Sequence, residues 1–294
     1  MYYLLYAFFY VLSLLPWRVI YIISDFTYCI IYYIIQYRRQ IVLDNLTIAF
    51  PEKTDQEKKV IAKEFYHNFV DNFIEVIKMF SISKKELNRR FTGNFELIND
   101  TCASGKNVQV HLGHFFNWEF ANIFFASNVV DPFLVVYMPI ENKAINKIVY
   151  EIRSRFGTHL IAATQYRKDF APFAKNRYSL ILVGDQNPAD PNKAYWTDFF
   201  GRKVPVVKGP ERGAVMNDNA ILMAKLTKIK RGYYNAHLEL LTTEPKALPD
   251  GEITKRMISF FEDSIREQPA NYLWSHRRWK WQFDPEKHGK LLIK

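Results

Sequence analysis

The residues of this chain best placed to do chemistry are a histidine and a glutamate. His114 and Glu119 lie in the run VHLGHFFNWE at 110–119, an H-x4-E spacing. A histidine can take a proton from a hydroxyl group near neutral pH, and a carboxylate on its other ring nitrogen fixes the tautomer. The pair therefore indicates a general base, with Glu119 as its orienting partner, that moves an acyl group onto an alcohol.

Two other interpretations of these residues compete with the first. Glu119 can stabilise the start of a helix through the helix dipole, while His114 lies on the surface without a role. His111, His114 and Glu119 can also be taken as metal ligands, but the spacing H-x2-H-x4-E matches no standard zinc signature. We therefore expect no metal here and a structural role for His111.

The elements expected around His114 place it at the end of a strand. A short apolar strand over 108–112 precedes it, and a helix over 118–126 follows. Asp185 follows a second apolar strand, over 178–183. In sheets of parallel strands, ligands usually bind at the carboxyl ends of the strands. His114 and Asp185 can therefore face the same crevice.

The rest of the chain alternates between helical and strand patterns. Apolar periodicity indicates further helices over 55–80, 142–156, 168–175 and 253–267, and further strands over 133–138, 159–162, 220–226 and 233–241. Thr54 and Glu57 predict a capping box at the start of the first helix. A loop rich in Pro, Asn and Gly is expected over 187–210. The alternation predicts an α/β fold with a layered, mostly parallel sheet flanked by helices.

The balance of charges points to an anionic partner. The 294 residues include 40 Lys and Arg against 30 Asp and Glu, a net charge of +10. Nucleic acid, an anionic lipid, or a phosphorylated or acidic carrier would fit this excess. Two cysteines, Cys29 and Cys102, make no disulfide framework and fit a reducing compartment.

The first 36 residues favour a membrane among these partners. Two apolar, aromatic runs, over 1–15 and 19–35, are separated by Pro16-Trp17-Arg18 and followed by Arg38 and Arg39. Each run is shorter than the roughly 20 residues that span a bilayer as a helix. Together they predict one kinked span, a re-entrant hairpin or helices lying in the interface. A pair of buried helices in a soluble protein is the alternative. We expect a membrane anchor over 1–36 and the main domain over 37–294.

Several short motifs resemble those of the bacterial late, or secondary, lipid A biosynthesis acyltransferases, the lauroyl and myristoyl transferases. The resemblance covers about 37–280. Its elements are N-L-x2-A-F-P-E at 45–52, H-x4-E at 114–119, I-R-S-R-F-G at 152–157, D-Q at 185–186, F-F-G at 199–201, G-P-E at 209–211 and W-S-H-R-R-W-K at 274–280. Their order and spacing together are more specific than any one of them. The segment after Glu211 departs from the alanine-rich, more helix-like stretch that members often have.

The resemblance implies a fold and an activity. The fold would be a glycerolipid-acyltransferase-like α/β domain with an N-terminal membrane anchor, on the cytoplasmic face of the bacterial inner membrane. The donor would be a fatty acyl chain on acyl carrier protein, and the acceptor a hydroxyl of an anionic lipid A precursor. His114 would be the general base and Glu119 its partner. The motif needs no cofactor.

Four further residues are candidates for substrate binding near the strand ends. Arg153 and Arg155 are planar donors that suit the phosphates of the lipid or of the donor's phosphopantetheine. A solvated helix face is the alternative for either one. Asp185 and Gln186 are expected to order the site by holding one of these arginines, or to form a plain turn.

A basic and aromatic cluster near the C-terminus completes the candidates. It consists of His276, Arg277, Arg278 and Lys280 with Trp274, Trp279 and Trp281. Cations on lipid phosphates and tryptophans among headgroups would suit a membrane surface. A nucleic-acid surface has a similar composition but leaves the N-terminal apolar runs unexplained, so no nucleic-acid partner is expected. Trp274 is expected to be buried.

Two alternative functions stay open. The same chemistry could act on another acceptor: an aminolipid, a lyso-phospholipid or a glycolipid. The chain could also be a non-catalytic lipid-binding protein at the membrane surface, although the presence of both His114 and Glu119 argues against it.

Overall fold

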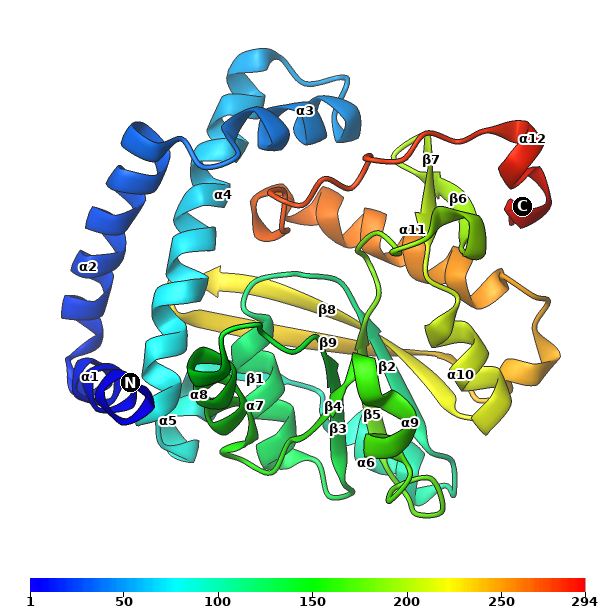
Figure 1. Ribbon diagram of the computed structural model, residues 1–294, viewed down its shortest axis with the longest axis horizontal. Coiled ribbons are helices and arrows are strands. Elements are labelled where there is room, and N and C mark those ends of the chain that lie inside the picture. Colours follow the sequence, from blue (N-terminus) through cyan, green and yellow to red (C-terminus); the bar gives the residue numbers. More distant parts are fainter. Residues whose placement is uncertain (294) are drawn as a thin grey trace.

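The structure, a computed structural model, describes residues 1–293 and is organised around a twisted sheet (Figure 1). Within these residues seven strands form the sheet in the order β1-β9-β8-β2-β5-β3-β4. They are β1 (Phe91–Gly93), β2 (Val108–Leu112), β3 (Phe133–Tyr137), β4 (His159–Ala162), β5 (Ser179–Val183), β8 (Ala220–Lys230) and β9 (Tyr233–Thr242). Only the β8–β9 pairing is antiparallel. The predicted α/β fold with a mostly parallel sheet is confirmed.

Strand β2 lies at the centre of the sheet, between β8 and β5. All five of its residues are buried, because both faces of the strand are covered. Val110 and Leu112 on one face line a cavity beneath α7 (Trp118–Asn128). Gln109, which alternates with them, bonds to the Pro210 carbonyl in α10 (Gly209–Asn217) at 2.6 Å. Helices α7 and α10 therefore lie on opposite faces of the sheet.

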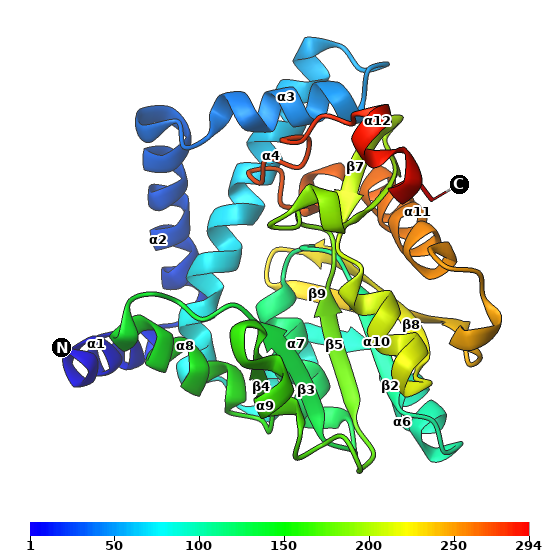
Figure 2. The ribbon, with the colours of Figure 1, turned by 45° about the vertical axis from the view of Figure 1, so that its right-hand side comes forward.

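The other helices surround the sheet and the two helices α7 and α10 (Figure 2). They include α3 (Arg39–Ala49), α4 (Asp55–Glu75) with its 3-10 extension η2 (Val76–Phe80), α5 (Lys84–Arg90), α6 (Glu96–Ala103), α8 (Lys143–Ser154), α9 (Tyr166–Phe170), α11 (Glu252–Glu267) and α12 (Pro285–His288). The capping box predicted at the start of α4 is confirmed, since Thr54 and Glu57 bond reciprocally. The helix expected over 168–175 is shorter and begins earlier, as α9.

The loop predicted over 187–210 is wrong in its second half. Strands β6 (Tyr195–Phe199) and β7 (Arg202–Val206) pair there as an antiparallel hairpin, a separate two-stranded sheet. Phe200 and Gly201 form the turn with positive φ angles of 52° and 70°. The hairpin forms because Trp196 and its apolar neighbours are buried, while Pro205 in β7 is tolerated in a strand with one partner.

The N-terminal runs form two helices, α1 (Tyr2–Leu14) and α2 (Trp17–Cys29), and the second continues as the π-helical turn η1 (Ile30–Ile35). Trp17–Ile35 is 19 residues long and, by length and composition, could cross a membrane; only 22% of its apolar window is buried. Ile22 and Phe26 are 67% and 69% exposed. The alternative of two buried helices is therefore wrong.

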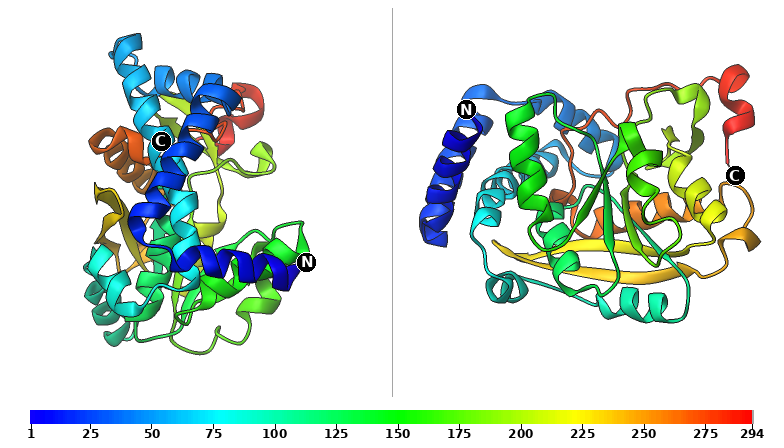
Figure 3. Two further views of the ribbon diagram at one scale, coloured as in Figure 1. Left: turned by 90° about the vertical axis from the view of Figure 1, so that its left-hand side faces the viewer. Right: turned by 60° about the horizontal axis from the view of Figure 1, so that its bottom comes forward.

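The N-terminal helices are nonetheless attached to the main domain. Helix α2 lies along α4, where the Ser24 hydroxyl donates to Asp71 at 2.6 Å (Figure 1). Helix α1 lies beside α8, where the Tyr2 hydroxyl contacts Glu151 (Figure 3). The predicted boundary at residue 36 coincides with the end of η1, and the division into anchor and domain stays a prediction.

Candidate active site

The sheet brings His114 and Asp185 together. Strands β2 and β5 are parallel neighbours with Leu112 opposite Val183, and each of the two polar residues comes two positions after its strand. The His114 Nδ1 and an Asp185 carboxylate oxygen are 2.6 Å apart. The other carboxylate oxygen accepts the backbone N–H of His114 at 3.1 Å. Asp185 thus holds both the ring and the backbone of His114.

Glu119, the expected partner of His114, has a different partner. Its carboxylate accepts from Arg153 Nε at 2.8 Å and from Trp118 Nε1 at 3.1 Å, and a second Arg153 nitrogen completes a bidentate pair. Asn117 caps α7, so Glu119 projects from the first helical turn toward α8, while His114 lies in the preceding turn. The orienting carboxylate is therefore Asp185, and the expectation that Asp185 holds an arginine is also wrong.

The charge of Asp185 follows from its surroundings. Burial tends to raise the pKa of the Asp185 carboxyl, but the charge and hydrogen bonds of His114 lower it to about 2, so Asp185 is ionised at neutral pH. The Tyr272 side chain also lowers the pKa of this carboxyl. With Nδ1–H donating to Asp185, Nε2 keeps a lone pair, and the Gln186 amide lies 3.2 Å from it. This is the tautomer that a general base needs.

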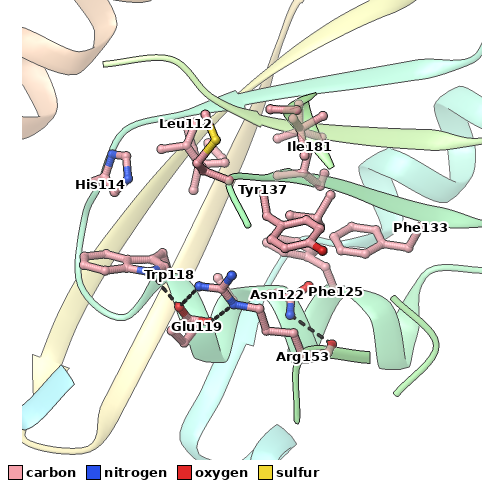
Figure 4. A pocket seen from close by; sticks show the side chains of 18 of the residues that line it. Leu112, His114, Trp118, Glu119, Asn122, Phe125, Phe133, Tyr137, Arg153 and Ile181 are labelled. Atoms are coloured by element: carbon pink, nitrogen blue, oxygen red, sulfur yellow. Dashed lines mark hydrogen bonds and ion pairs between the residues drawn. The ribbon is translucent and has the colours of Figure 1, made fainter. Parts of the chain in front are cut away.

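Beside His114 lies a cavity of about 420 Å³ with mostly apolar walls. The walls come from β2, β3, β5 and α7 and include Leu112, Phe125, Phe133, Val135 and Ile181. Figure 4 shows the Arg153–Glu119 pair in one part of the cavity wall and His114 in another. Burial tends to lower the pKa of Arg153, but the charge of Glu119 raises it above its ordinary value, so the guanidinium stays charged.

Two other arginines that were predicted to bind substrate, Arg155 and Arg278, do not line this cavity. Arg155 donates to the Ile82 carbonyl at 3.1 Å and to the Met79 carbonyl, because it ends α8 against the η2–α5 connection. Arg278 is 1% exposed and donates to the Asn187 side chain at 2.8 Å and to the Pro205 carbonyl at 3.0 Å. Both are structural, and their predicted contact with substrate is corrected.

The C-terminal cluster is divided between inside and outside. Trp274 is buried, as predicted, and Arg277 is exposed. His276 is half-buried, and its Nε2 accepts the Asn187 backbone N–H at 3.3 Å. Burial lowers the pKa of His276 to about 4, so the ring is neutral. Of the four basic residues of the cluster, only Arg277 and Lys280 are exposed and free to bind substrate or headgroups.

Some residues of the site were missed. Asn187 bonds to Arg278 and to the Arg277 carbonyl, and so fixes the segment after Asp185. Glu75 is fully buried in α4 and accepts from Nδ2 of Asn117, the residue that precedes Trp118 in the cavity wall, at 2.9 Å. Its hydrogen-bond partners, Tyr21, Asn117 and Tyr234, come from three segments far apart in the sequence. No sequence signal therefore distinguishes Glu75 from a solvated helix residue.

Residues that could hold a metal are not gathered here. Within 1–293 there is no group of three or more His, Cys, Asp or Glu side chains arranged to hold a metal ion. His111 is buried with its Nε2 at 2.6 Å from the Gln109 amide, and burial lowers its pKa to about 3. His111 is therefore a neutral core residue on the face of β2 opposite the cavity. The absence of a metal requirement stays a prediction.

The fold and the site define a class: an α/β protein with a His–Asp pair at the carboxyl ends of neighbouring strands, next to an apolar cavity. Comparison with known sequences gives the family. The bacterial lipid A biosynthesis acyltransferase family matches residues 1–281, and the chain belongs to this family.

Individual relatives are distant but cover most of the chain. One, from Shigella flexneri, is named lipid A biosynthesis acyltransferase 2 and is 20% identical over 239 residues, 78% of this chain and 74% of that protein. Another, the lipid A biosynthesis palmitoleoyltransferase of Escherichia coli (strain K12), is 19% identical over 246 residues, 83% of this chain and 79% of that protein. The resemblance drawn from the motifs is confirmed, and the family supports an acyltransferase acting on lipid A.

Proposed function

We propose that this protein transfers a fatty acyl group from an acyl carrier protein thioester to a hydroxyl of a lipid A precursor, with His114 as general base and Asp185 as its partner. The observation that carries the proposal is the geometry of His114. Its Nδ1 is held by Asp185 at 2.6 Å, and the residue lines an apolar cavity of about 420 Å³. A base of this kind needs a hydroxyl beside it and an acyl chain in the cavity.

The chemical steps follow from this arrangement. The His114 Nε2 takes the proton of the acceptor hydroxyl as its oxygen attacks the thioester carbonyl. The tetrahedral intermediate collapses by breaking the C–S bond, and the imidazolium returns the proton to the leaving thiolate. The Asp185 carboxylate stabilises the imidazolium between the two steps. An ester and a free thiol are the products, and no other reactant is needed.

Arg153 supplies positive charge to the same cavity. Its guanidinium is paired with Glu119 and so held in one position in the wall. We propose that Arg153 stabilises the oxyanion that develops on the thioester carbonyl, as fixed donors do in a site that excludes water. Glu119 is then a positioning residue for Arg153 rather than for His114. This assigns both ends of the H-x4-E motif to one reaction.

Direct transfer, without an acyl-enzyme, fits the positions of the two cysteines. Cys102 is buried, with its Sγ 3.5 Å from the hydroxyl of Ser179, the first residue of β5. That end of the sheet is opposite to the one that holds His114. Cys29 lies in α2, among the exposed apolar residues. Neither thiol can receive the acyl group from a donor bound at His114.

The apolar N-terminal helices support a location on the bacterial inner membrane, with the catalytic domain on the cytoplasmic face. The exposed side chains of α1 and α2 present an apolar surface that lipid would cover. The net charge of +10 suits both an anionic lipid surface and an acidic carrier protein.

The test is an acyl-transfer assay in detergent with acyl carrier protein loaded with a long-chain acyl group. Lipid A precursors, a lyso-aminolipid and a lyso-phospholipid are offered as acceptors, and products are read by mass spectrometry. Wild type should add one acyl mass to the lipid A precursor, and folded His114→Ala should keep only a small residual rate. Acylation of another acceptor alone would replace the proposed acceptor, and full activity of His114→Ala would overturn the mechanism.

A further inference from the structure

A second hollow lies outside the catalytic cavity, where α3 meets the C-terminal segment. It has a volume of about 670 Å³. We name it the arginine groove, and its lining residues are Gln36, Arg38, Arg39, Gln40, Ile41, Leu43 and Arg277. Three of these seven residues are arginines, and they come from segments at opposite ends of the chain.

Specific hydrogen bonds bring the two segments together. Arg38 donates to the Ser275 carbonyl at 3.0 Å. The Asn45 amide in α3 donates to the carbonyls of Trp274 and His276 at 2.7 and 2.8 Å. The C-terminal segment is thereby fixed beneath α3, as the ribbon shows (Figure 1). The groove is therefore part of the fold, and Arg277 is held beside the arginines of the N-terminal segment.

The charges of the groove are left unneutralised by the protein. Over residues 1–293, no ion pair includes Arg38, Arg39 or Arg277. The acidic side chain nearest in sequence, Asp44, accepts instead from the Gln40 amide at 2.7 Å. Three guanidinium groups without counter-charges favour an anionic ligand.

The groove lies between an apolar surface and the catalytic pair. Its first residue, Gln36, follows η1, where Ile34 and Ile35 are exposed. At its other side the Arg277 carbonyl accepts from the Asn187 amide at 2.7 Å. Asn187 is adjacent to Gln186, whose amide is 3.2 Å from His114 Nε2. A lipid with its chains against η1 and a charged headgroup in the groove would thus have its polar part near His114.

From these contacts we propose that the arginine groove binds a phosphate group on the polar head of the acceptor lipid. This inference rests on the proposed function. Planar guanidinium groups bind phosphate oxygens in pairs, and the groove lies at the level where the apolar surface of the helices ends. It also replaces the expectation that Arg153 and Arg155 bind the lipid phosphate, because Arg153 lies in the wall of the acyl cavity and Arg155 donates to the carbonyls of Met79 and Ile82.

The test compares two acceptors that differ only in phosphate: a phosphorylated lipid A precursor and the same lipid after phosphatase treatment. The variants are Arg39→Gln and Arg277→Gln, with Arg212→Gln, on the exposed surface of α10, as the matched control. For each arginine removed, KM for the phosphorylated acceptor should rise on the order of tenfold, as for loss of a hydrogen bond to a charged group. The kcat, the KM for the dephosphorylated lipid and the Arg212→Gln kinetics should not change.

Other outcomes would overturn either the groove proposal or the proposed function on which it rests. Equal losses on both acceptors, or no loss on either, would show that the groove does not bind the phosphate. A rise in KM for the acyl carrier protein instead would assign the groove to the donor. A separate experiment measures how much phosphorylated lipid each variant binds in detergent when no acyl donor is present. Failure of transfer with retained, arginine-dependent binding would reject the proposed function and leave the groove standing.

Discussion

At the scale of single residues, the site contains two side-chain pairs with different partners. His114 pairs with Asp185 across the ends of two strands, and Arg153 pairs with Glu119 in the cavity wall. The motif that first drew attention to this segment joins one residue of each pair. Five residues of spacing could not reveal which partner each had, because both partners come from other segments.

Arg153 and Arg155 allow a matched test of the cavity cation. Arg153→Gln should lower kcat on the order of 10²- to 10³-fold, as does loss of one oxyanion donor. Arg155→Gln removes bonds to two carbonyls away from the cavity, so it should lower the free energy of unfolding by about 1 kcal/mol and leave kcat near wild type. Steady-state kinetics and chemical unfolding in detergent measure both. Similar kcat values for the two variants would contradict the role of Arg153.

Glu75 gives a pH-dependent prediction. Burial first, and the charge of Asp71 second, raise the pKa of Glu75 from 4.5 to about 7. The folded state therefore holds this proton more tightly than the unfolded state, and the stability that follows is complete below 4.5 and lost as pH rises through about 7. Each pKa unit corresponds to about 1.4 kcal/mol.

The measurement is the free energy of unfolding of wild type and Glu75→Gln between about pH 5 and about pH 8. Subtracting the variant removes the contributions of His111, His276 and other titrating groups. Wild type should lose stability relative to Glu75→Gln as pH rises. A difference that stays constant over this range would mean that Glu75 does not titrate there.

At the scale of elements, local sequence patterns predicted the bounds of some strands and one helix cap, because neighbouring residues determine these features. The bounds of β2 and β4 agree with the predicted 108–112 and 159–162, and the α4 cap was predicted from two side chains. The order of the strands was not predictable, since β2 and β5 are neighbours in the sheet although β3 and β4 lie between them in the sequence. That order decides that Asp185, not Glu119, reaches His114. The β6–β7 hairpin was missed because Pro, Asn and Gly dominated the local signal.

Two helix caps test whether α7 positions the cavity cation. Asn117 caps α7, which includes Glu119, and Thr54 caps α4 far from the site. Replacement of either cap by Ala should lower the free energy of unfolding by roughly 0.5–2 kcal/mol. Only Asn117→Ala should also lower kcat, because Glu119 and its arginine partner lose their fixed position. Thermal unfolding and kinetics on the same samples decide, and equal kcat values would contradict this coupling.

At the scale of the whole molecule, one surface is apolar and another, next to it, is basic. The exposed face of α2 and η1 ends at the arginine groove, and the groove is connected to His114 and Asp185 through Asn187. This sequence of surfaces suits a protein that takes an amphiphile from a bilayer without removing it completely. The length and polarity of the N-terminal runs predicted the apolar part, whereas the groove needed the contacts between the two ends of the chain.

Exposed residues of α2 should control attachment to lipid. Ile22→Ser with Phe26→Ser should reduce co-flotation with anionic vesicles and shift the free energy of unfolding by less than about 0.5 kcal/mol, as is usual at exposed sites. Met216→Ser with Ile229→Ser, also exposed but on α10 and β8, is the control and should float like wild type. Flotation of the α2 variant at wild-type levels would show that α2 is not the surface that meets the membrane.

The central claim is that Asp185, and not Glu119, orients His114, and the rate of acyl transfer by Asp185→Asn with and without His114→Ala tests it most directly. If the two residues act as one unit, Asp185→Asn alone should lower kcat on the order of 10³- to 10⁴-fold, and adding His114→Ala should cause little further loss. Glu119→Gln with His114→Ala should instead lose more than either single change. A folded Asp185→Asn protein that keeps kcat within a few-fold of wild type would contradict the account.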